Sequence, residues 1–307
     1  MENTVLKTYN LSKAYGRFNA LEDVNITIKK GQIYGFIGQN GAGKTTLIRI
    51  IAGLSFKSKG NFELFGENEG RNLEQARRRM GCIIDTPVFY PDKTAYSNLE
   101  IERIQKGIPG KECIEKALTM VGLQDVKKKK VRNFSLGMKQ RLGIAMALLG
   151  DPEFLILDEP INGLDPIGIV EVREMLKKLN VEYGVTILIS SHILSELHQL
   201  ANCYGIIHKG KLLEQITFEE LTNRCKKFIY IKVDDATKAA FVIDKKLNTS
   251  NFQVFPGNII NLYDYLDQPG KVSTTLAVEG VVVEQITPVG DDLETFFSKL
   301  IGGSNNA

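Results

Sequence analysis

The fold is decided by one stretch of the chain, Gly38-Gln39-Asn40-Gly41-Ala42-Gly43-Lys44-Thr45-Thr46, which fits the pattern G-x-x-x-x-G-K-[ST]. Residues 32–37 before it are apolar and predict a buried strand, and residues 46–53 after it predict a helix that ends at a glycine. Strand, glycine-rich loop and helix in this order are the context in which the pattern binds phosphate. An ordinary glycine-rich turn would not have these flanks.

The residue types in this loop suit a phosphate ligand. Gly38, Gly41 and Gly43 permit positive φ and a close approach of the backbone. Backbone N–H groups can then surround a phosphate at the start of a helix. Lys44 adds a positive charge for the β- and γ-phosphates of a nucleotide, and Thr45 offers a hydroxyl to Mg²⁺. The loop is therefore the first candidate site.

Composition limits the class of protein. The chain has 307 residues, of which 43% are hydrophobic and 24% charged, which is typical of a globular protein of about two domains. A net charge of +3 is too small to indicate a nucleic-acid partner, and the lysine run at 127–130 is interpreted as a solvated loop. The widely spaced cysteines favour reduced thiols in a cytosol over a disulfide framework or a zinc site.

Membrane signals are missing from the sequence pattern. The first residues lack a basic and then apolar signal sequence. No run approaches the ~20 apolar residues of a membrane span. A role at a membrane would therefore need a separate partner.

A second apolar stretch ends in two carboxylates. Residues 154–157 predict a strand buried on both faces of a parallel sheet, and Asp158 and Glu159 follow at its carboxyl end, where ligands bind in open α/β sheets. Neighbouring strand residues point to opposite sides, so we expect two roles. Asp158 would hold Mg²⁺ through water and Glu159 would polarise an attacking water. A turn of solvated acids is the alternative, and the phosphate-binding loop upstream argues against it.

Three further positions are candidates on weaker grounds. His192 follows the predicted strand 185–189, again at a carboxyl end, whereas His198 and His208 are interpreted as structural or surface residues. Ser135 is placed to cap a helix that has Gly137 in its first turn. This helix N-terminus is either a second site that can bind an anion or only a capped helix end.

Two more candidates, Asp85 and Tyr15, each have an alternative interpretation as a purely structural residue. Asp85 ends the predicted strand 80–85, before a segment whose prolines exclude a helix. It either has a role at the site or caps a turn. Tyr15 lies in a polar stretch; from the residues alone a half-buried tyrosine on a strand edge is favoured over a base-stacking one.

The rest of the chain divides by pattern. Residues 4–31 predict antiparallel strands, and residues 86–150 a mostly helical subdomain with helices at 97–121 and 136–150, the first opened by a capping box from Ser97 to Glu100. After residue 215 the pattern predicts a short helix and then β-α-β-β-α-β with a trailing helix at 291–301. We therefore expect an α/β core in residues 1–215 and a small accessory α+β domain in residues 216–307.

Taken together, these motifs resemble those of the ATP-binding subunits of ABC transporters, over residues 1 to about 215. The loop at 38–46 is similar to their Walker A motif, and residues 154–159 to their Walker B motif, with Glu159 as the catalytic carboxylate. Residues 134–138 stand where the family carries its Leu-Ser-Gly-Gly-Gln signature.

The resemblance extends to two further motifs and has two departures. Gly163-Leu164-Asp165 resembles the D-loop and His192 the switch histidine. The signature has Leu136 for a glycine and Met138 for glutamine, and Asp85 stands where the family usually has the Q-loop glutamine. In both departures the motifs resemble those of the subgroup associated with bacitracin resistance and lantibiotic self-immunity.

The resemblance implies a P-loop NTPase fold and a set of site residues. The residues implied to bind ATP are Tyr15, Gly38, Gln39, Asn40, Gly41, Ala42, Gly43, Lys44, Thr45, Thr46, Ser135 and Gly137. The residues implied to be catalytic are Glu159 and His192. The residues implied to serve Mg²⁺ are Thr45, Asp85 and Asp158.

The function that the resemblance implies is ATP hydrolysis that drives export through a separate integral membrane permease, with a peptide antibiotic as the candidate substrate. It implies a head-to-tail dimer, with itself or with a homologous ATPase subunit, and a cytoplasmic location on the inner face of the membrane, with no nucleic-acid partner. The rivals are a soluble ABC ATPase acting on ribosomes or DNA, a P-loop kinase or GTPase, and a regulatory module that binds ATP with little turnover.

Overall fold

The computed structural model describes residues 4–290 and 293–303. The chain divides into two compact units, residues 1–218 and residues 219–307. The division falls a few residues after the boundary that the sequence pattern places at 215. The first unit contains two sheets and the second unit one, and each unit has its own apolar core.

The first unit is built on a six-stranded sheet. Its order is β10 (Lys211–Thr217), β9 (Cys203–His208), β4 (Ile33–Ile37), β8 (Thr186–Ser191), β7 (Phe154–Asp158) and β6 (Met80–Ile83). All neighbours pair in parallel except β9 and β10. Every residue of β4, β7, β8 and β9 is buried, which is typical of parallel strands covered on both faces. The expected α/β class is confirmed.

A second, antiparallel sheet carries the start of the chain. In it β1 (Thr4–Tyr15) pairs with β2 (Phe18–Val24), β3 (Thr27–Lys29) and β5 (Lys59–Leu64). Two helices of this region are α1 (Lys44–Ile51) and α2 (Gly70–Arg78). Buried side chains of both sheets and of α1 form one core, for example Leu6, Tyr34, Leu47 and Ile156.

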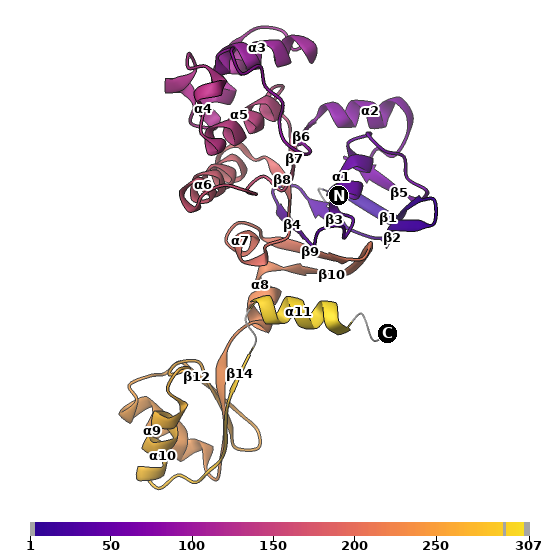
Figure 1. Ribbon diagram of the computed structural model, residues 1–307. Coiled ribbons are helices and arrows are strands. Elements are labelled where there is room, and N and C mark those ends of the chain that lie inside the picture. Colours follow the sequence, from indigo (N-terminus) through magenta and orange to yellow (C-terminus); the bar gives the residue numbers. More distant parts are fainter. Residues whose placement is uncertain (1–3, 291–292, 304–307) are drawn as a thin grey trace. The chain divides into compact units, whose positions relative to one another are not determined.

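The predicted helical subdomain contains three helices and two short 3-10 turns. The helices are α3 (Ala95–Gln105), α4 (Glu112–Met120) and α5 (Leu136–Leu148), which lie together in Figure 1. The 3-10 turns are Gln124–Val126 and Val131–Asn133. The single helix predicted over 97–121 is wrong, because the chain turns at Gly107 and Gly110, which both have positive φ.

The predicted capping box of α3 is also wrong. The N-cap is Thr94, whose hydroxyl oxygen accepts a hydrogen bond from the Ser97 backbone N–H at 3.1 Å. Glu100 instead pairs with Arg103 at 2.9 Å. The helices after β7 and β8 are α6 (Pro166–Tyr183), which ends at Gly184, and α7 (Leu194–His198).

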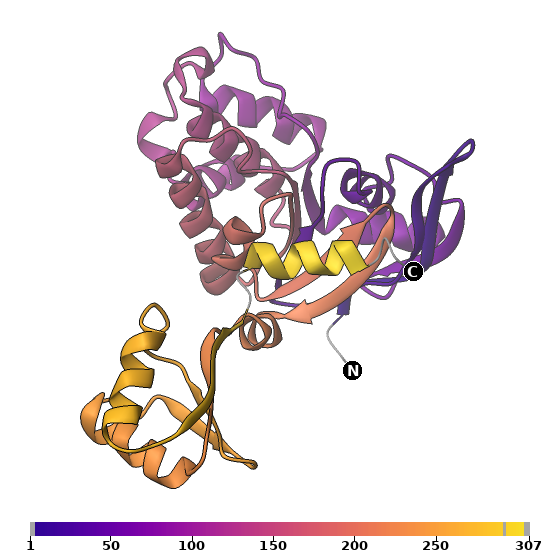
Figure 2. The same ribbon diagram turned by 60° about the horizontal axis from the view of Figure 1, so that its bottom comes forward.

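The second unit has the predicted β-α-β-β-α-β order. Its elements, after α8 (Phe218–Arg224) at the boundary, are β11 (Phe228–Val233), α9 (Ala236–Lys246), β12 (Phe252–Phe255), β13 (Ile259–Leu262), α10 (Pro269–Val278), β14 (Val283–Val289) and α11 (Leu293–Gly303). The antiparallel sheet has the order β12-β13-β11-β14, and α9 and α10 lie on one of its faces (Figure 2). Residues 291–292 of the predicted last helix lie outside the described residues.

Candidate functional site

The glycine-rich loop joins β4 to α1, and its glycines serve different purposes. Gly41 and Gly43 have φ of 80° and 109°, a region that glycine adopts without strain. Gly38 has no positive φ. A Cβ there would lie 2.6 Å from the Ile207 carbonyl oxygen, and one at Gly43 would lie 2.6 Å from that of Ala20. Close packing against β9 and β2 therefore requires glycine at both ends of the loop.

Lys44 and Thr45 start α1 and reach two carboxylates. The Lys44 side chain is 5% exposed, and its Nζ donates to the Gly38 carbonyl oxygen at 2.6 Å and pairs with Glu159 Oε1 at 3.2 Å. The Thr45 hydroxyl donates to Asp158 Oδ2 at 2.6 Å. The structure thus brings together four residues that the sequence identified from two separate motifs.

The direction of Glu159 differs from the expectation. Strand β7 ends at Asp158, and Glu159 has a left-handed backbone with φ 48°, which costs about 1–2 kcal/mol for a residue with a side chain. Strand alternation therefore does not apply to the pair. The Glu159 carboxylate turns toward the loop instead, where its Oε2 lies 2.6 Å from His192 Nδ1. A carboxylate accepts, so Nδ1 of His192 carries the proton.

A cleft of about 270 Å³ opens above the loop. The residues that line it are Tyr15, Phe18, Ala20, Asn40, Gly41, Gly43, Lys44, Thr45, Thr46 and Glu159. Tyr15 is 51% exposed at the end of β1, which fits the half-buried alternative, and it also borders the cleft. Phe18, opposite Tyr15 in the β1–β2 pair, was missed; an aromatic residue in the polar hairpin 16–19 was the available signal.

Two loop residues outside the cleft lining hold its shape. The Ala42 backbone N–H donates to the Gln39 carbonyl oxygen at 3.1 Å, which closes a turn at the tip of the loop. Ala42 is buried and Gln39 is exposed. The whole loop from Gly38 to Thr46 is therefore one compact unit around the start of α1.

A second, smaller cleft lies on the other side of Glu159. It measures about 120 Å³ and is lined by Glu159, Ile161, Asn162, Gly163, Leu164, Ile169, Ser191, His192, Ile193 and Glu196. Glu159 borders both clefts, whereas Gly163 and Leu164 of the D-loop resemblance border only this one, and Asp165 borders neither. His192 is thus placed to orient Glu159 from the side away from the loop.

Asp85 lies apart from the other carboxylates. Strand β6 ends at Ile83, two residues earlier than predicted, and Asp85 has a positive φ of 63°. Its carboxylate pairs with Arg49 of α1 at 2.8 Å, and its side chain is 67% exposed. Among the described residues, no hydrogen bond joins Asp85 to Thr45 or Asp158. The structure therefore does not gather the three expected Mg²⁺ residues into one cluster.

Ser135 and Gly137 also lie outside the cleft of this chain. Ser135 caps α5 as expected, because its hydroxyl oxygen accepts a hydrogen bond from the Met138 N–H at 3.2 Å. Gly137 lies beside Gly168 of α6, where an added Cβ would come within 3.8 Å of the Gly168 Cα. Ser135 is exposed, so this helix start faces solvent in the single chain.

Three other titratable groups near the sheet, Cys82, His198 and His208, line neither cleft. Burial, and then the negative charge of Asp158, raise the pKa of the Cys82 thiol to about 12, so it stays protonated at neutral pH. Burial lowers the pKa of His198, whose ring stacks on Phe218 with centroids 4.9 Å apart. His208 is buried in β9. These positions fit the structural interpretation of His198 and His208, which stays a prediction.

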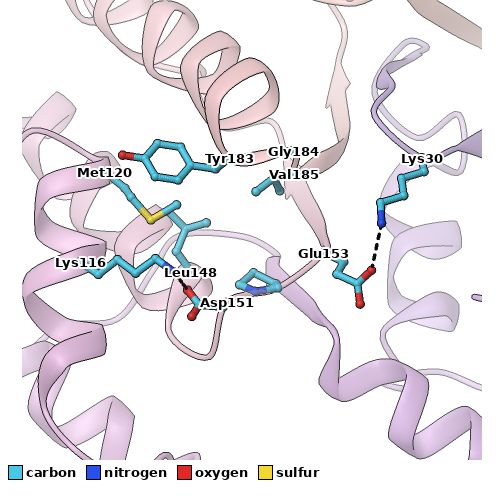
Figure 3. A pocket seen from close by; sticks show the side chains of 10 residues that line it. Lys30, Lys116, Met120, Leu148, Asp151, Glu153, Tyr183, Gly184 and Val185 are labelled. Carbon is cyan, nitrogen blue, oxygen red and sulfur yellow. Dashed lines mark ion pairs between the residues drawn. The ribbon is translucent and has the colours of Figure 1, made fainter.

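The larger cavity of the first unit is not the candidate site. It measures about 310 Å³ and lies at the amino ends of β7 and β8, opposite to the ends that carry Asp158 and His192. Figure 3 shows ion pairs at its rim: Lys116 lies 2.6 Å from Asp151, and Lys30 lies 3.6 Å from Glu153. Among its ten lining residues is none of the predicted site residues.

The oxygen atoms at the loop suit a hard cation. Mg²⁺ prefers oxygen ligands, keeps several waters and commonly joins one or two protein groups to substrate phosphates. Thr45 Oγ1 and Asp158 Oδ2, 2.6 Å apart beside the phosphate loop, are such a pair. No group of three or more His, Cys, Asp or Glu in the described ranges could hold a metal alone. The donor set therefore fits Mg²⁺ that arrives with a phosphate ligand.

Comparison with known proteins agrees with this geometry. The family model described as ABC transporter matches residues 21–162. The chain is 48% identical over 301 residues to the bacitracin transport ATP-binding protein BcrA of Bacillus licheniformis, covering 98% of each chain. It is 44% identical over 219 residues to the lantibiotic transport ATP-binding protein SrtF of Streptococcus pyogenes, covering 71% of this chain and 93% of SrtF.

The solved structures lead to the same family. The dimeric structure of the ATP-binding cassette MJ0796 in a post-hydrolysis state, bound to ADP and Pi, has a TM-score of 0.61 and 26% identity, covering 69% of this chain and 98% of that one. In the part of the chain that the structure describes, no helix has the length and apolarity needed to cross a membrane. The chain belongs to the ATP-binding subunits of ABC transporters.

Proposed function

We propose that this chain hydrolyses ATP with Mg²⁺ and that hydrolysis drives the export of a peptide antibiotic through a separate integral membrane permease. The observation that supports hydrolysis is a pair of contacts beside the cleft. Lys44 pairs with Glu159, and the Thr45 hydroxyl donates to Asp158. The substrate class is supported by the 48% identity to a protein named for bacitracin transport, which extends over 98% of both chains and so includes the second unit.

In this proposal the loop binds the nucleotide. The exposed ring of Tyr15 stacks on adenine, and the backbone N–H groups of residues 38–46 surround the phosphates. Lys44 donates to the β- and γ-phosphate oxygens. Thr45 and Asp158 would hold Mg²⁺, which when bound would supply positive charge to the phosphates.

Glu159 accepts a proton from the attacking water. His192, with its proton on Nδ1, keeps the Glu159 carboxylate oriented toward the loop. Little covalent chemistry is required of the protein, since phosphoryl transfer depends mainly on position and charge. Asp85, which pairs with Arg49 at the far end of α1, acts in coupling to the permease more than in ATP binding.

Ser135 and Gly137 complete the site of a second ATPase subunit, either another copy of this chain or a homologue. Their helix start is exposed and lies outside the cleft of their own chain, so a nucleotide can reach it only from outside. The dimeric MJ0796 structure with ADP and Pi supports this arrangement. The permease would hold the subunit at the cytoplasmic face of the membrane, and the small net charge gives no reason to propose nucleic acid.

The test uses sensitive bacteria that carry this chain together with a cognate permease. Cells with both proteins should tolerate more bacitracin than cells with either alone, and Glu159→Gln should abolish the difference. Purified chain should release phosphate from ATP in the presence of Mg²⁺. Protection that persists with Glu159→Gln would mean that the chain does not power the export.

A further inference from the structure

One buried hydroxyl lies between the two carboxylates of the site and is used by none of the roles above. Ser190 is the fifth residue of β8 and is fully buried, with 0% of its surface exposed. In the parallel pair of β7 and β8 it stands opposite Asp158. The position is therefore set by strand register, at the end of the sheet where the ligand cleft opens.

The hydroxyl makes two hydrogen bonds with different partners. The Asp158 carboxylate can only accept, so the single Ser190 proton is donated to Asp158 Oδ1, at 2.5 Å. The oxygen then accepts the Glu159 backbone N–H at 2.9 Å. Ser190 thus contacts the side chain of one acid and the backbone of the next.

The bond to Glu159 acts where the chain needs it. Glu159 has a left-handed backbone, which a side-chain-bearing residue keeps only when its surroundings hold it there. That conformation directs the Glu159 carboxylate to Lys44 and His192. If the N–H lost its acceptor, the turn could relax toward an extended conformation and the carboxylate would move away from both.

We propose that Ser190 is a positioning residue for the hydrolysis: its hydroxyl, anchored by its bond to Asp158, fixes the turn that aims Glu159 at the reacting water. The inference rests on the proposed ATP hydrolysis and assigns Ser190 no contact with the nucleotide. Its effect should therefore appear in the chemical step and act through Glu159.

The main test is Ser190→Ala, measured by the steady-state rate of ATP hydrolysis. Loss of the positioning bonds should lower kcat about tenfold and leave KM for ATP unchanged. Ser190→Cys keeps the shape but offers only a weak donor and acceptor, so its kcat should fall in the same direction. In a Glu159→Gln background, Ser190→Ala should cause no further loss, since the group that it positions is already gone.

Thr186→Val is the matched control. Thr186 begins the same strand, is also fully buried, and its hydroxyl oxygen accepts the Gly31 N–H at 3.0 Å, far from the cleft. It should lower the melting temperature about as much as Ser190→Ala and leave kcat unchanged. An equal kcat for Ser190→Ala and Thr186→Val, or a further loss in the Glu159→Gln background, would overturn the inference. Wild-type chain that releases no phosphate from ATP would overturn the proposed function and this inference with it.

Discussion

Strands β6 and β7 are neighbours in one parallel sheet, and a carboxylate follows or ends each of them. Asp158 at the end of β7 is buried, and two hydroxyl groups, those of Thr45 and Ser190, donate to it. Asp85, two residues past the end of β6, is 67% exposed and has one ion pair, with Arg49.

The difference between these two strand ends is one of restraint. The buried acid is held by groups from two other elements that cannot move without disturbing the core, and leaving a buried partner unsatisfied is costly. The exposed acid is screened by water, and a surface pair of this kind contributes about 0–1 kcal/mol. We therefore expect the residues at the end of β7 to control ATP hydrolysis and Asp85, after β6, to control coupling to the permease.

The largest effect is expected at the restrained end. Glu159→Gln keeps the shape of the side chain and removes the base, so hydrolysis should fall at least about 100-fold while ATP still binds. Phosphate release and ATP-dependent dimerisation on a sizing column measure the two properties. Glu153→Gln is the control, because Glu153 precedes the same strand at its opposite end, where it pairs with Arg79. Hydrolysis at the wild-type rate in Glu159→Gln would remove Glu159 from the mechanism.

A smaller effect is expected from replacing Lys44, which forms an ion pair with Glu159. Lys44→Ala deletes the charge offered to the β- and γ-phosphates, so affinity for ATP should fall about 10- to 100-fold. Titration with a fluorescent ATP analogue measures it, and Lys30→Ala, at the other cavity, is the control. If the affinity of Lys44→Ala equals that of the wild type, the loop is not a phosphate site.

The exposed strand end should show a divided effect. Asp85→Asn should leave ATP affinity within about twofold, as expected for a surface pair, and should reduce transport in cells that contain the permease. Arg49→Gln breaks the same pair from the other side and should have the same phenotype. Full transport by both variants would reduce Asp85 to a turn residue, whereas loss of ATP binding would place it with the restrained acids.

The smallest effect is expected from removing the second unit. A chain that ends at Phe218 should fold and bind ATP as the whole chain does, since all the site residues lie before that position. A cut within β10, for example after Leu213, would be too early. Strand β10 continues to Thr217, and Gln215 accepts a hydrogen bond from the Tyr34 hydroxyl. If the shortened chain has the circular-dichroism spectrum of a folded protein but does not bind nucleotide, the first unit does not function independently.

Local patterns were enough for much of this molecule. The loop at 38–46, the strand at 154–158 and the cap at Ser135 could be predicted because each depends on residues close together in the chain. The same holds for the β-α-β-β-α-β order of the second unit, where apolar periods alternate between strand and helix. The prediction of the α3 N-cap was wrong because Thr94 and Ser97 are both favourable N-cap residues, and the helix begins after Thr94.

The sequence by itself determined the family motifs and the kinds of residue at the site, since spacing along the chain specifies both. Only the tertiary structure decided how the acids are held. The left-handed turn at Glu159, the hydroxyl of Ser190 and the Arg49–Asp85 pair depend on contacts between residues 31 to 36 positions apart. Such contacts follow from the register of parallel strands and from the packing of α1, and a one-dimensional pattern contains neither.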